Sequence, residues 1–297
     1  MAFNKRSTSE HVTEGLDLSG KTAVITGVNS GLGQESMRVL AARGARIIGL
    51  ARTQAKADAA CKAVKGDATG MACELSDFDS VAACGEKIRA GGQPVDILMT
   101  NAGIMAPKDL SLSHGVEQQF ATNQLGHFIL INQLLEQVKA AASGRIVVLS
   151  SAAHMLTVRG GIDFGNLDAQ RGYDPWRFYG QSKLANLLTA RVLAEKLKDS
   201  KATANAVHPG IINTNLARDT GGAFSRVMML FAPLMSKSLE QGAATQCMVA
   251  VHPSLEGVSG KYFSDCKVAR STSLGNNMIL AHECWEASEE LTRPYLP

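Results

Sequence analysis

The sequence predicts an α/β protein with a Rossmann-type doubly wound sheet, mostly parallel and seven-stranded, with helices on both faces. Short apolar runs rich in β-branched residues alternate with longer helix-like stretches along the chain. A glycine-rich turn follows the first apolar run, where such folds bind a dinucleotide. The 297 residues contain no internal repeat and no low-complexity linker, so we expect one domain.

Seven apolar runs are the expected strands. The first, at 21–26, ends at Gly27, where the chain turns. The others lie at 45–50, 69–73, 96–100, 145–149, 203–207 and 261–263. Helix-like segments separate them near 32–43, 54–65, 77–90, 115–141, 179–198 and 239–251. Helical connections of this kind are typical of a parallel sheet.

The ends of the chain and its composition set limits on its class. Residues 1–18 are polar and non-periodic, and we expect them to form an N-terminal extension, either an arm or a loose segment, before a single domain at 19–297. The start of the chain has no apolar segment, and the longest apolar segment, 227–232, is too short to cross a bilayer. We therefore expect a cytoplasmic protein without a membrane anchor.

Charge and cysteine spacing exclude two further kinds of site. The net charge is only +3 and no stripe of Lys and Arg is present, so nucleic acid is not an expected partner. The six cysteines show neither a CxxC pair nor the spacing of metal ligands. We expect reduced, inert thiols and no metal site.

The glycine-rich turn is the first motif that carries chemistry. Three glycines let the backbone turn tightly and approach a pyrophosphate, which then lies at the positive end of the following helix. The spacing is GxxxGxG, and no GK[ST] follows, which excludes a P-loop. We assign cofactor binding to the residues of this turn: Gly27, Asn29, Ser30, Gly31, Leu32 and Gly33.

The end of the second strand indicates which dinucleotide binds. Folds that prefer NAD place an acid there to hold the ribose 2′-hydroxyl, but this strand ends in Leu50-Ala51-Arg52. The guanidinium of Arg52 is suited to a 2′-phosphate. The sequence therefore favours NADP as the cofactor, with NAD as the alternative.

A tyrosine and a lysine four residues apart form the second chemical motif. Tyr179 and Lys183 lie one turn apart on the same face of the expected helix. A phenol has a reference pKa of about 10, and a neighbouring ammonium lowers it by favouring the phenolate. Tyr179 is therefore a candidate general acid and base.

Taken together, these motifs resemble the classical short-chain dehydrogenase/reductase family, and within it the retinol-dehydrogenase-like branch. The resemblance extends from about Leu18 to Phe263. It implies a dinucleotide-binding catalytic domain with four catalytic residues: Asn123, Ser151, Tyr179 and Lys183.

The resemblance also implies further cofactor contacts. Asn101, Ala102 and Gly103 look like the motif that steadies the central sheet beside the cofactor. Glu74-Leu75 stands where the family more often has Asp-Leu near the adenine. Contacts to the cofactor are further implied for Tyr179 and Lys183, and contacts to the nicotinamide carboxamide for Pro209, Gly210 and Thr214. Because Ser30 replaces the basic residue of some NADP-preferring members, Arg52 is the main indication for NADP.

The mechanism that the family implies is hydride transfer between a nicotinamide and a carbonyl or alcohol. Tyr179 exchanges the proton, while Lys183 lowers the Tyr179 pKa and holds the nicotinamide ribose. Ser151 binds the substrate oxygen, where charge develops. Asn123 holds a water that relays protons from Lys183. His127, His154 and His208 are expected to be structural, although two of them adjoin active-site motifs.

The substrate is expected to be a small lipophilic alcohol or ketone. Family members build this pocket from loops, here 104–114, 152–176 and 216–238 with the C-terminal tail, and methionines make several of these loops apolar and adaptable. The alternative is that these side chains simply pack under a lid helix. A homodimer, a homotetramer and a single chain all stay open.

Two other functions compete with this hypothesis. The same scaffold can reduce an activated C=C bond. A catalytically silent member would act as a nucleotide-sensing or scaffold protein, but it would be expected to lose Ser151, Tyr179 or Lys183, and all three are present.

Overall fold

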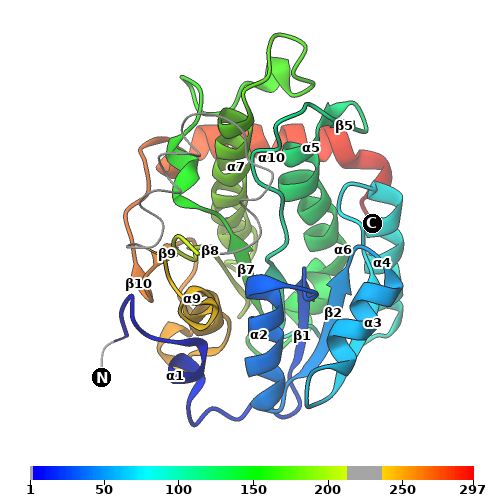
Figure 1. Ribbon diagram of the computed structural model, residues 1–297, viewed down its shortest axis with the longest axis vertical. Helices are drawn as coiled ribbons and strands as arrows, with labels where there is room; N and C mark the ends of the chain where they lie inside the picture. The colour runs from blue at the N-terminus through cyan, green and yellow to red at the C-terminus, as the bar shows by residue number, and fades with distance from the viewer. Residues whose placement is uncertain (1–2, 213–235) are drawn as a thin grey trace.

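An eight-stranded sheet runs through the centre of the computed structural model, which describes residues 3–212 and 236–297 (Figure 1). Its strand order is β10-β9-β8-β7-β4-β1-β2-β3. The seven predicted strands are confirmed as parallel neighbours, with bounds that differ from the prediction by one residue at most: β1 Thr22–Thr26, β2 Arg46–Ala51, β3 Ala68–Ala72, β4 Ile97–Thr100, β7 Arg145–Leu149, β8 Thr203–His208 and β9 Tyr262–Ser264. The prediction missed β10 (Lys267–Val268), which is antiparallel and too short to show a pattern.

The strand order reverses at β1, which creates the crevice of the fold. β2 pairs with one side of β1 and β4 with the other, so the connections leave β1 in opposite directions. Ligands of doubly wound sheets bind at such a point, beyond the carboxyl ends of the strands. The glycine turn after Thr26 and the segment after Thr100 therefore form the two sides of one crevice.

Successive side chains of each strand point to opposite faces of the sheet and pack in two apolar layers. Val24 packs in the layer under α4 (Phe78–Ala90), α6 (His127–Ala140) and α7 (Pro175–Lys196). Its neighbours Ala23 and Ile25 pack in the layer under α2 (Gly31–Ala42), α3 (Gln54–Lys62) and α9 (Leu239–Val251). All six cysteines are buried free thiols in these layers. None of the described helices is long and apolar enough to cross a membrane.

The predicted helix at 115–141 is instead a composite element. It begins with a hairpin of β5 (Leu112–Ser113) and β6 (Val116–Glu117), continues through α5 (Gln118–Phe120) and a π-helical turn at Ala121–Gly126, and only then becomes α6. The predicted helix at 179–198 starts earlier, at Pro175. The side chain of Asp174 caps it by accepting the N–H groups of residues 176 and 177, and proline is favoured at the first helical position.

The N-terminal segment is an arm that packs on the domain, and not the loose alternative. Residues 9–13 form α1 (Ser9–Thr13), which lies beside α9 (Figure 1). Val12 is buried in the apolar layer under α2 and α9. The carboxylate of Glu10 binds Arg38 at 2.8 Å and Arg43 at 2.7 Å, which ties α1 to α2. Specific pairing of a few side chains therefore orders a segment that has no periodic pattern.

A second helix that the sequence analysis missed, α10 (Met278–Thr292), crosses the outer side of α7 (Figure 1). Trp285 packs edge-on against Phe128 of α6, with 4.7 Å between ring centroids. Every residue of α7 from Phe178 to Ala190 is buried. α10 therefore covers the side of α7 and α6 on which it lies.

The substitution Trp285→Ala is expected to destabilise the fold by about 3–5 kcal/mol, the usual cost of truncating a buried aromatic side chain. The matched control is Ile279→Ala on the same helix, because Ile279 is 73% exposed and Trp285 only 5%. Urea unfolding of both variants measures the difference. Equal losses in the two variants would mean that α10 is not part of the core.

Candidate active site

The glycine turn after β1 forms a cradle at the N-terminus of α2. Gly27 and Gly31 have positive φ values of 74° and 59°, which side chains disfavour. A Cβ atom on Gly33 would lie 2.4 Å from the Gly27 carbonyl oxygen, so only glycine fits there. The N-cap residue Ser30 makes no side-chain capping bond to α2. This leaves the first N–H groups of the helix to bind an anion such as a pyrophosphate.

Thr26 joins the two sides of the crevice. Its hydroxyl accepts the backbone N–H groups of Asn101 and Ala102 at 2.9 Å each, and its carbonyl accepts the Asn101 side chain at 2.9 Å. Gln246 on α9 donates to the other end of that side chain, to Asn101 Oδ1 at 3.2 Å. The motif at 101–103 is therefore held from β1 and α9. Thr26 adjoins the glycine turn in the sequence and could have been found there, but no local pattern indicates Gln246.

His127 links Thr26 to the helix that carries Asn123. Its Nδ1 lies 3.0 Å from the Asn123 carbonyl oxygen, which can only accept, so Nδ1 carries the proton. Its Nε2 lies 3.0 Å from Thr26 Oγ1, whose two lone pairs are already occupied, so the hydroxyl donates to Nε2. Burial lowers the His127 pKa to about 4, and the ring is neutral near pH 7. The predicted structural role of His127 is confirmed.

Acid is expected to destabilise the protein through His127. The folded-state pKa of about 4 lies below the ordinary 6.5, so between these values the unfolded chain binds the extra proton. The stability is complete above pH 6.5 and falls as the pH drops toward 4, by up to about 3 kcal/mol from this group. Urea unfolding of wild type and His127→Gln across this range tests the prediction. A stability difference that does not vary with pH would contradict it.

Asn123 lies in the π-helical turn, and its side-chain amide and backbone carbonyl have protein partners. Its side chain accepts Ile104 N–H at 2.9 Å and donates to the Ile104 carbonyl and to Ser182 Oγ, both at 3.0 Å. Its carbonyl accepts His127 and, at 2.7 Å, Asn186 Nδ2. Asn123 therefore fastens the segment after β4 to α7. Its role in holding a relay water stays a prediction.

Lys183 and Tyr179 project from the same side of α7, as their spacing predicts. Lys183 Nζ lies 5.8 Å from the centre of the Tyr179 ring. It donates to the Leu149 carbonyl at 3.0 Å and to Asn186 Oδ1 at 3.4 Å. Asn186, which the sequence analysis did not single out, thus contacts both Lys183 and Asn123. Its position three residues after Lys183, on the same helix face, was the signal that could have found it.

Ser151 follows β7 and lies beside Tyr179. Its hydroxyl caps a 3₁₀ turn (Ala152–Met155) by accepting Ala153 N–H at 3.1 Å, and it is near enough to the Tyr179 phenol to lower the Tyr179 pKa. His154 Nδ1 lies 2.7 Å from the Ser151 carbonyl oxygen, and His208 accepts the N–H of residue 152 at 3.2 Å. Both histidines hold the Ser151 backbone in place, which confirms their expected structural roles.

Burial dominates the titration of the tyrosine–lysine pair. It raises the Tyr179 pKa to about 12, against a smaller opposite effect of the hydrogen bond with Ser151. It lowers the Lys183 pKa to about 7. The prediction that Lys183 lowers the Tyr179 pKa is wrong for this structure, because burial raises that pKa and Lys183 does not offset the increase. The physical reason is that Lys183 is itself desolvated, so part of its charge is lost near neutral pH.

Arg52 and Glu74 follow the neighbouring strands β2 and β3. Arg52 is exposed, and within residues 3–212 and 236–297 no carboxylate forms an ion pair with it. The Glu74 carboxylate accepts Ser76 N–H at 3.2 Å and Ser76 Oγ–H at 3.0 Å, while Leu75 is buried. Arg52 and Glu74 thus both lie just beyond the carboxyl ends of their strands, the edge of the sheet at which doubly wound folds bind ligands.

Of the three predicted substrate loops, 104–114 and 152–176 lie side by side. The Tyr173 hydroxyl donates to the Pro107 carbonyl at 2.8 Å, and Gln119 bridges the backbones of Ala106 and Pro175. Pro209 and Gly210 follow β8 at the carboxyl edge of the sheet. Thr214 and most of the predicted loop at 216–238 lie outside the described residues.

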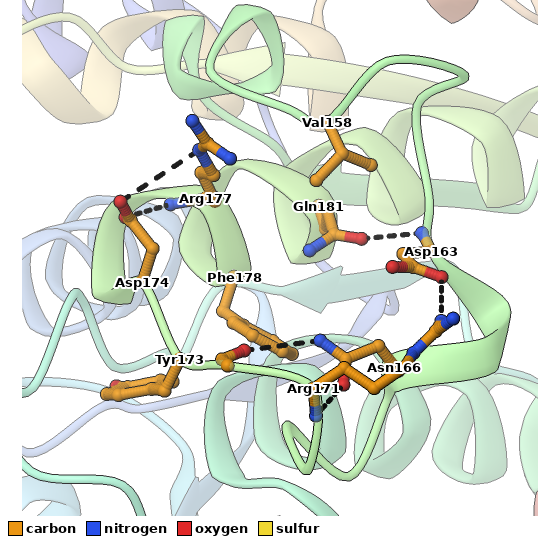
Figure 2. Close-up of a pocket in the computed structure, with 10 residues that line it drawn as sticks. Val158, Asp163, Asn166, Arg171, Tyr173, Asp174, Arg177, Phe178 and Gln181 are labelled. Atoms are coloured by element: carbon orange, nitrogen blue, oxygen red, sulfur yellow. Dashed lines mark hydrogen bonds and ion pairs between the residues drawn. The ribbon is translucent and has the colours of Figure 1, made fainter.

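A cavity of about 330 Å³ lies between the 152–176 loop and the N-terminal half of α7 (Figure 2). Its lining includes Asp163, Arg171, Arg177 and Gln181. Gln181 is two residues beyond Tyr179, a rotation of about 200° around the helix. The cavity therefore lies on the side of α7 opposite Tyr179, and none of the predicted catalytic residues lines it.

Comparison with known proteins identifies the family. The profile described as short chain dehydrogenase matches residues 21–222, more than half of the chain. The chain belongs to this family. This dehydrogenase is 40% identical to the short-chain dehydrogenase TIC 32 B, chloroplastic, of Brassica napus, over 97% of the chain and 94% of that relative. It is 39% identical to retinol dehydrogenase 12 of Mus musculus, over 94% of the chain and 88% of that relative.

Solved structures agree with the fold of this dehydrogenase. A crystal structure of an uncharacterized protein from Mycobacterium paratuberculosis has a TM-score of 0.76 and 31% identity, covering 95% of this chain and 97% of that chain. A short chain dehydrogenase/reductase family protein has a TM-score of 0.64 and 26% identity, covering 84% and 96%. The dehydrogenase is thus an oxidoreductase of the predicted family, with the predicted doubly wound architecture.

Proposed function

We propose that this dehydrogenase is NADP-dependent and transfers a hydride between the nicotinamide and the carbonyl or alcohol carbon of a lipophilic substrate. The observation that carries the proposal is the convergence of Ser151, Tyr179 and Lys183 next to the crevice after β1 and β4. The family supplies the reaction class. The chemistry of the residues supplies the details below.

The residues around the crevice fit a phosphorylated dinucleotide. The Gly27–Gly33 cradle keeps its backbone bare where a pyrophosphate would approach α2, because Gly33 has no room for a Cβ and Gly27 and Gly31 have positive φ values. Arg52 would hold the 2′-phosphate, and Pro209-Gly210 would lie at the nicotinamide end. When bound, the cofactor supplies or accepts the hydride.

Tyr179 is the proposed proton donor, which favours the direction of reduction. With a pKa raised by burial to about 12, its phenol keeps its proton near neutral pH. It can therefore donate Oη–H to the substrate oxygen as negative charge develops there. Ser151 orients that oxygen through its hydroxyl, and Lys183 holds the nicotinamide ribose.

An apolar approach to Ser151 supports a lipophilic substrate. Met155 and Leu156 follow Ser151 by only a few residues and are 60% and 38% exposed. Large exposed apolar side chains beside a catalytic serine suit an apolar substrate body. The names of the retinol dehydrogenase relatives point the same way.

The test is to incubate purified protein with NADPH and a panel of lipophilic aldehydes and ketones. Oxidation of NADPH is measured by the loss of its nicotinamide absorbance. We expect turnover with at least one aldehyde and a clear preference for NADPH over NADH. Tight cofactor binding without turnover of any carbonyl would instead support the silent, nucleotide-sensing alternative.

A further inference from the structure

Three chain segments meet beyond the carboxyl end of β8, on the side where Pro209 and Gly210 lie. The segment 211–212 runs parallel to the residues before α9: Lys237 N–H donates to the Ile211 carbonyl at 2.8 Å, and Ile212 forms a parallel bridge with Lys237. The third segment is the tip of the β9–β10 hairpin at Asp265 and Cys266. None of the motifs in the sequence indicated that these segments touch.

The hairpin tip has a defined geometry that aims Asp265 at Lys237. Asp265 and Cys266 are the two residues between the paired Ser264 and Lys267, and both have positive φ values, 53° and 59°. Two-residue hairpin turns of this kind favour Asn and Asp. The Cys266 N–H donates to Thr245 Oγ1 of α9 at 3.2 Å, which docks the tip onto that helix.

An ion pair closes the cluster over Gly210. Lys237 Nζ lies 2.6 Å from Asp265 Oδ1, and the lysine side chain is only 12% exposed. The stem of Lys237 passes over Gly210: a Cβ there would lie 2.8 Å from Lys237 Cδ and 2.9 Å from Cε. Gly210 has a φ of 98°, a conformation that other residues rarely adopt. Lys237 therefore packs directly on the backbone of the Pro209–Gly210 segment.

We propose that Lys237 is a positioning residue, and that its ion pair with Asp265 holds the Pro209–Gly210 segment at the nicotinamide end of the cofactor site. The inference rests on the proposed function, because it assumes that a nicotinamide dinucleotide binds in the crevice. We call the Lys237–Asp265 pair with Gly210 the β8 clamp.

The β8 clamp acts on one half of the cofactor only. β8 is separated from β1 by β7 and β4, whereas the glycine cradle follows β1 and Arg52 follows β2. The adenosine half would therefore bind at strands β1 and β2, along the same edge of the sheet but several strands away from the clamp. Loosening the clamp should weaken binding of the whole dinucleotide but not of an adenosine fragment that carries the 2′-phosphate and lacks the nicotinamide.

The experiment compares two ligands, NADPH and 2′-phosphoadenosine 5′-phosphate, by fluorescence or calorimetric titration. The variants are Lys237→Met and Asp265→Asn; the second removes the charge but keeps a residue that the turn favours. Lys237→Arg is the conservative variant, and Lys267→Met, an exposed lysine on the same hairpin, is the matched control. Urea unfolding verifies that each variant folds.

For Lys237→Met and Asp265→Asn we expect the Kd of NADPH to rise up to about tenfold, because binding must then order the Pro209–Gly210 segment without the free energy that this charge-assisted hydrogen bond supplied. The Kd of the fragment should stay within about twofold of wild type, Lys237→Arg should largely restore NADPH binding, and Lys267→Met should change nothing. An unchanged Kd for NADPH, or equal weakening of both ligands, overturns the clamp while leaving the proposed function intact. A wild-type protein that binds neither ligand overturns both.

Discussion

Replacing Tyr179 by phenylalanine is expected to lower turnover by about 10²–10⁴-fold, the usual contribution of a positioned general acid. The substitution removes only the hydroxyl, so the ring still fills its buried place on α7. The phenol donates the proton that the substrate oxygen requires, whereas Ser151 is proposed only to hydrogen-bond that oxygen and Lys183 to hold the nicotinamide ribose. The Kd of NADPH should change little, because the glycine cradle and Arg52 are untouched.

Tyr295→Phe is the matched control for this prediction. Tyr295 lies at the C-terminus, where its ring packs against Phe78, remote from the crevice. Steady-state kinetics should show wild-type kcat for this variant. If Tyr179→Phe retained more than about a tenth of wild-type turnover, Tyr179 would not be the general acid.

The substitution Arg52→Asp is expected to reverse the cofactor preference, with the NADPH-to-NADH ratio of kcat/KM falling by about a hundredfold or more. Charge-assisted hydrogen bonds to a phosphate contribute about 1.5–3 kcal/mol, and a carboxylate in place of the guanidinium repels the 2′-phosphate. The same carboxylate can accept the 2′-hydroxyl of NADH, so activity with NADH should rise or stay constant.

Arg46→Asp is the matched control, because Arg46 begins the strand that Arg52 follows and its side chain is half-exposed beside Asp67. It should leave the ratio unchanged. An equal loss with NADPH and NADH in Arg52→Asp would show that Arg52 does not bind the 2′-phosphate.

The parts of the fold that could be predicted are those that local sequence encodes. Val24 and Ile25 alternate between two apolar layers, and the runs like theirs locate seven of the eight strands of the central sheet. The elements that were missed depend on tertiary contacts. α1 is ordered by Glu10 pairing with Arg38 and Arg43, and two-residue β10 exists because the turn at Asp265 and Cys266 folds it back on β9.

In the candidate site, the sequence could predict where the motif residues lie on their elements, but not the long-range hydrogen bonds that hold them in place. The spacing of Tyr179 and Lys183 placed them on one face of a helix, and the structure agrees. The bonds from Gln246 to Asn101 and from His127 to Thr26 join residues more than a hundred positions apart, which no local pattern encodes. The directions of the Tyr179 and Lys183 pKa shifts could not be predicted from the sequence either, because burial rather than the neighbouring charge determines them.

The central claim is that a hydride passes between the nicotinamide and a carbonyl carbon under proton donation from Tyr179. The most direct measurement uses NADPH with deuterium at the transferred position and a lipophilic α,β-unsaturated aldehyde, with the product analysed by NMR. The account predicts an allylic alcohol with deuterium on the carbinol carbon, formed by wild type and not by Tyr179→Phe. A saturated aldehyde with deuterium on the β-carbon would contradict it and identify the enzyme as a C=C reductase.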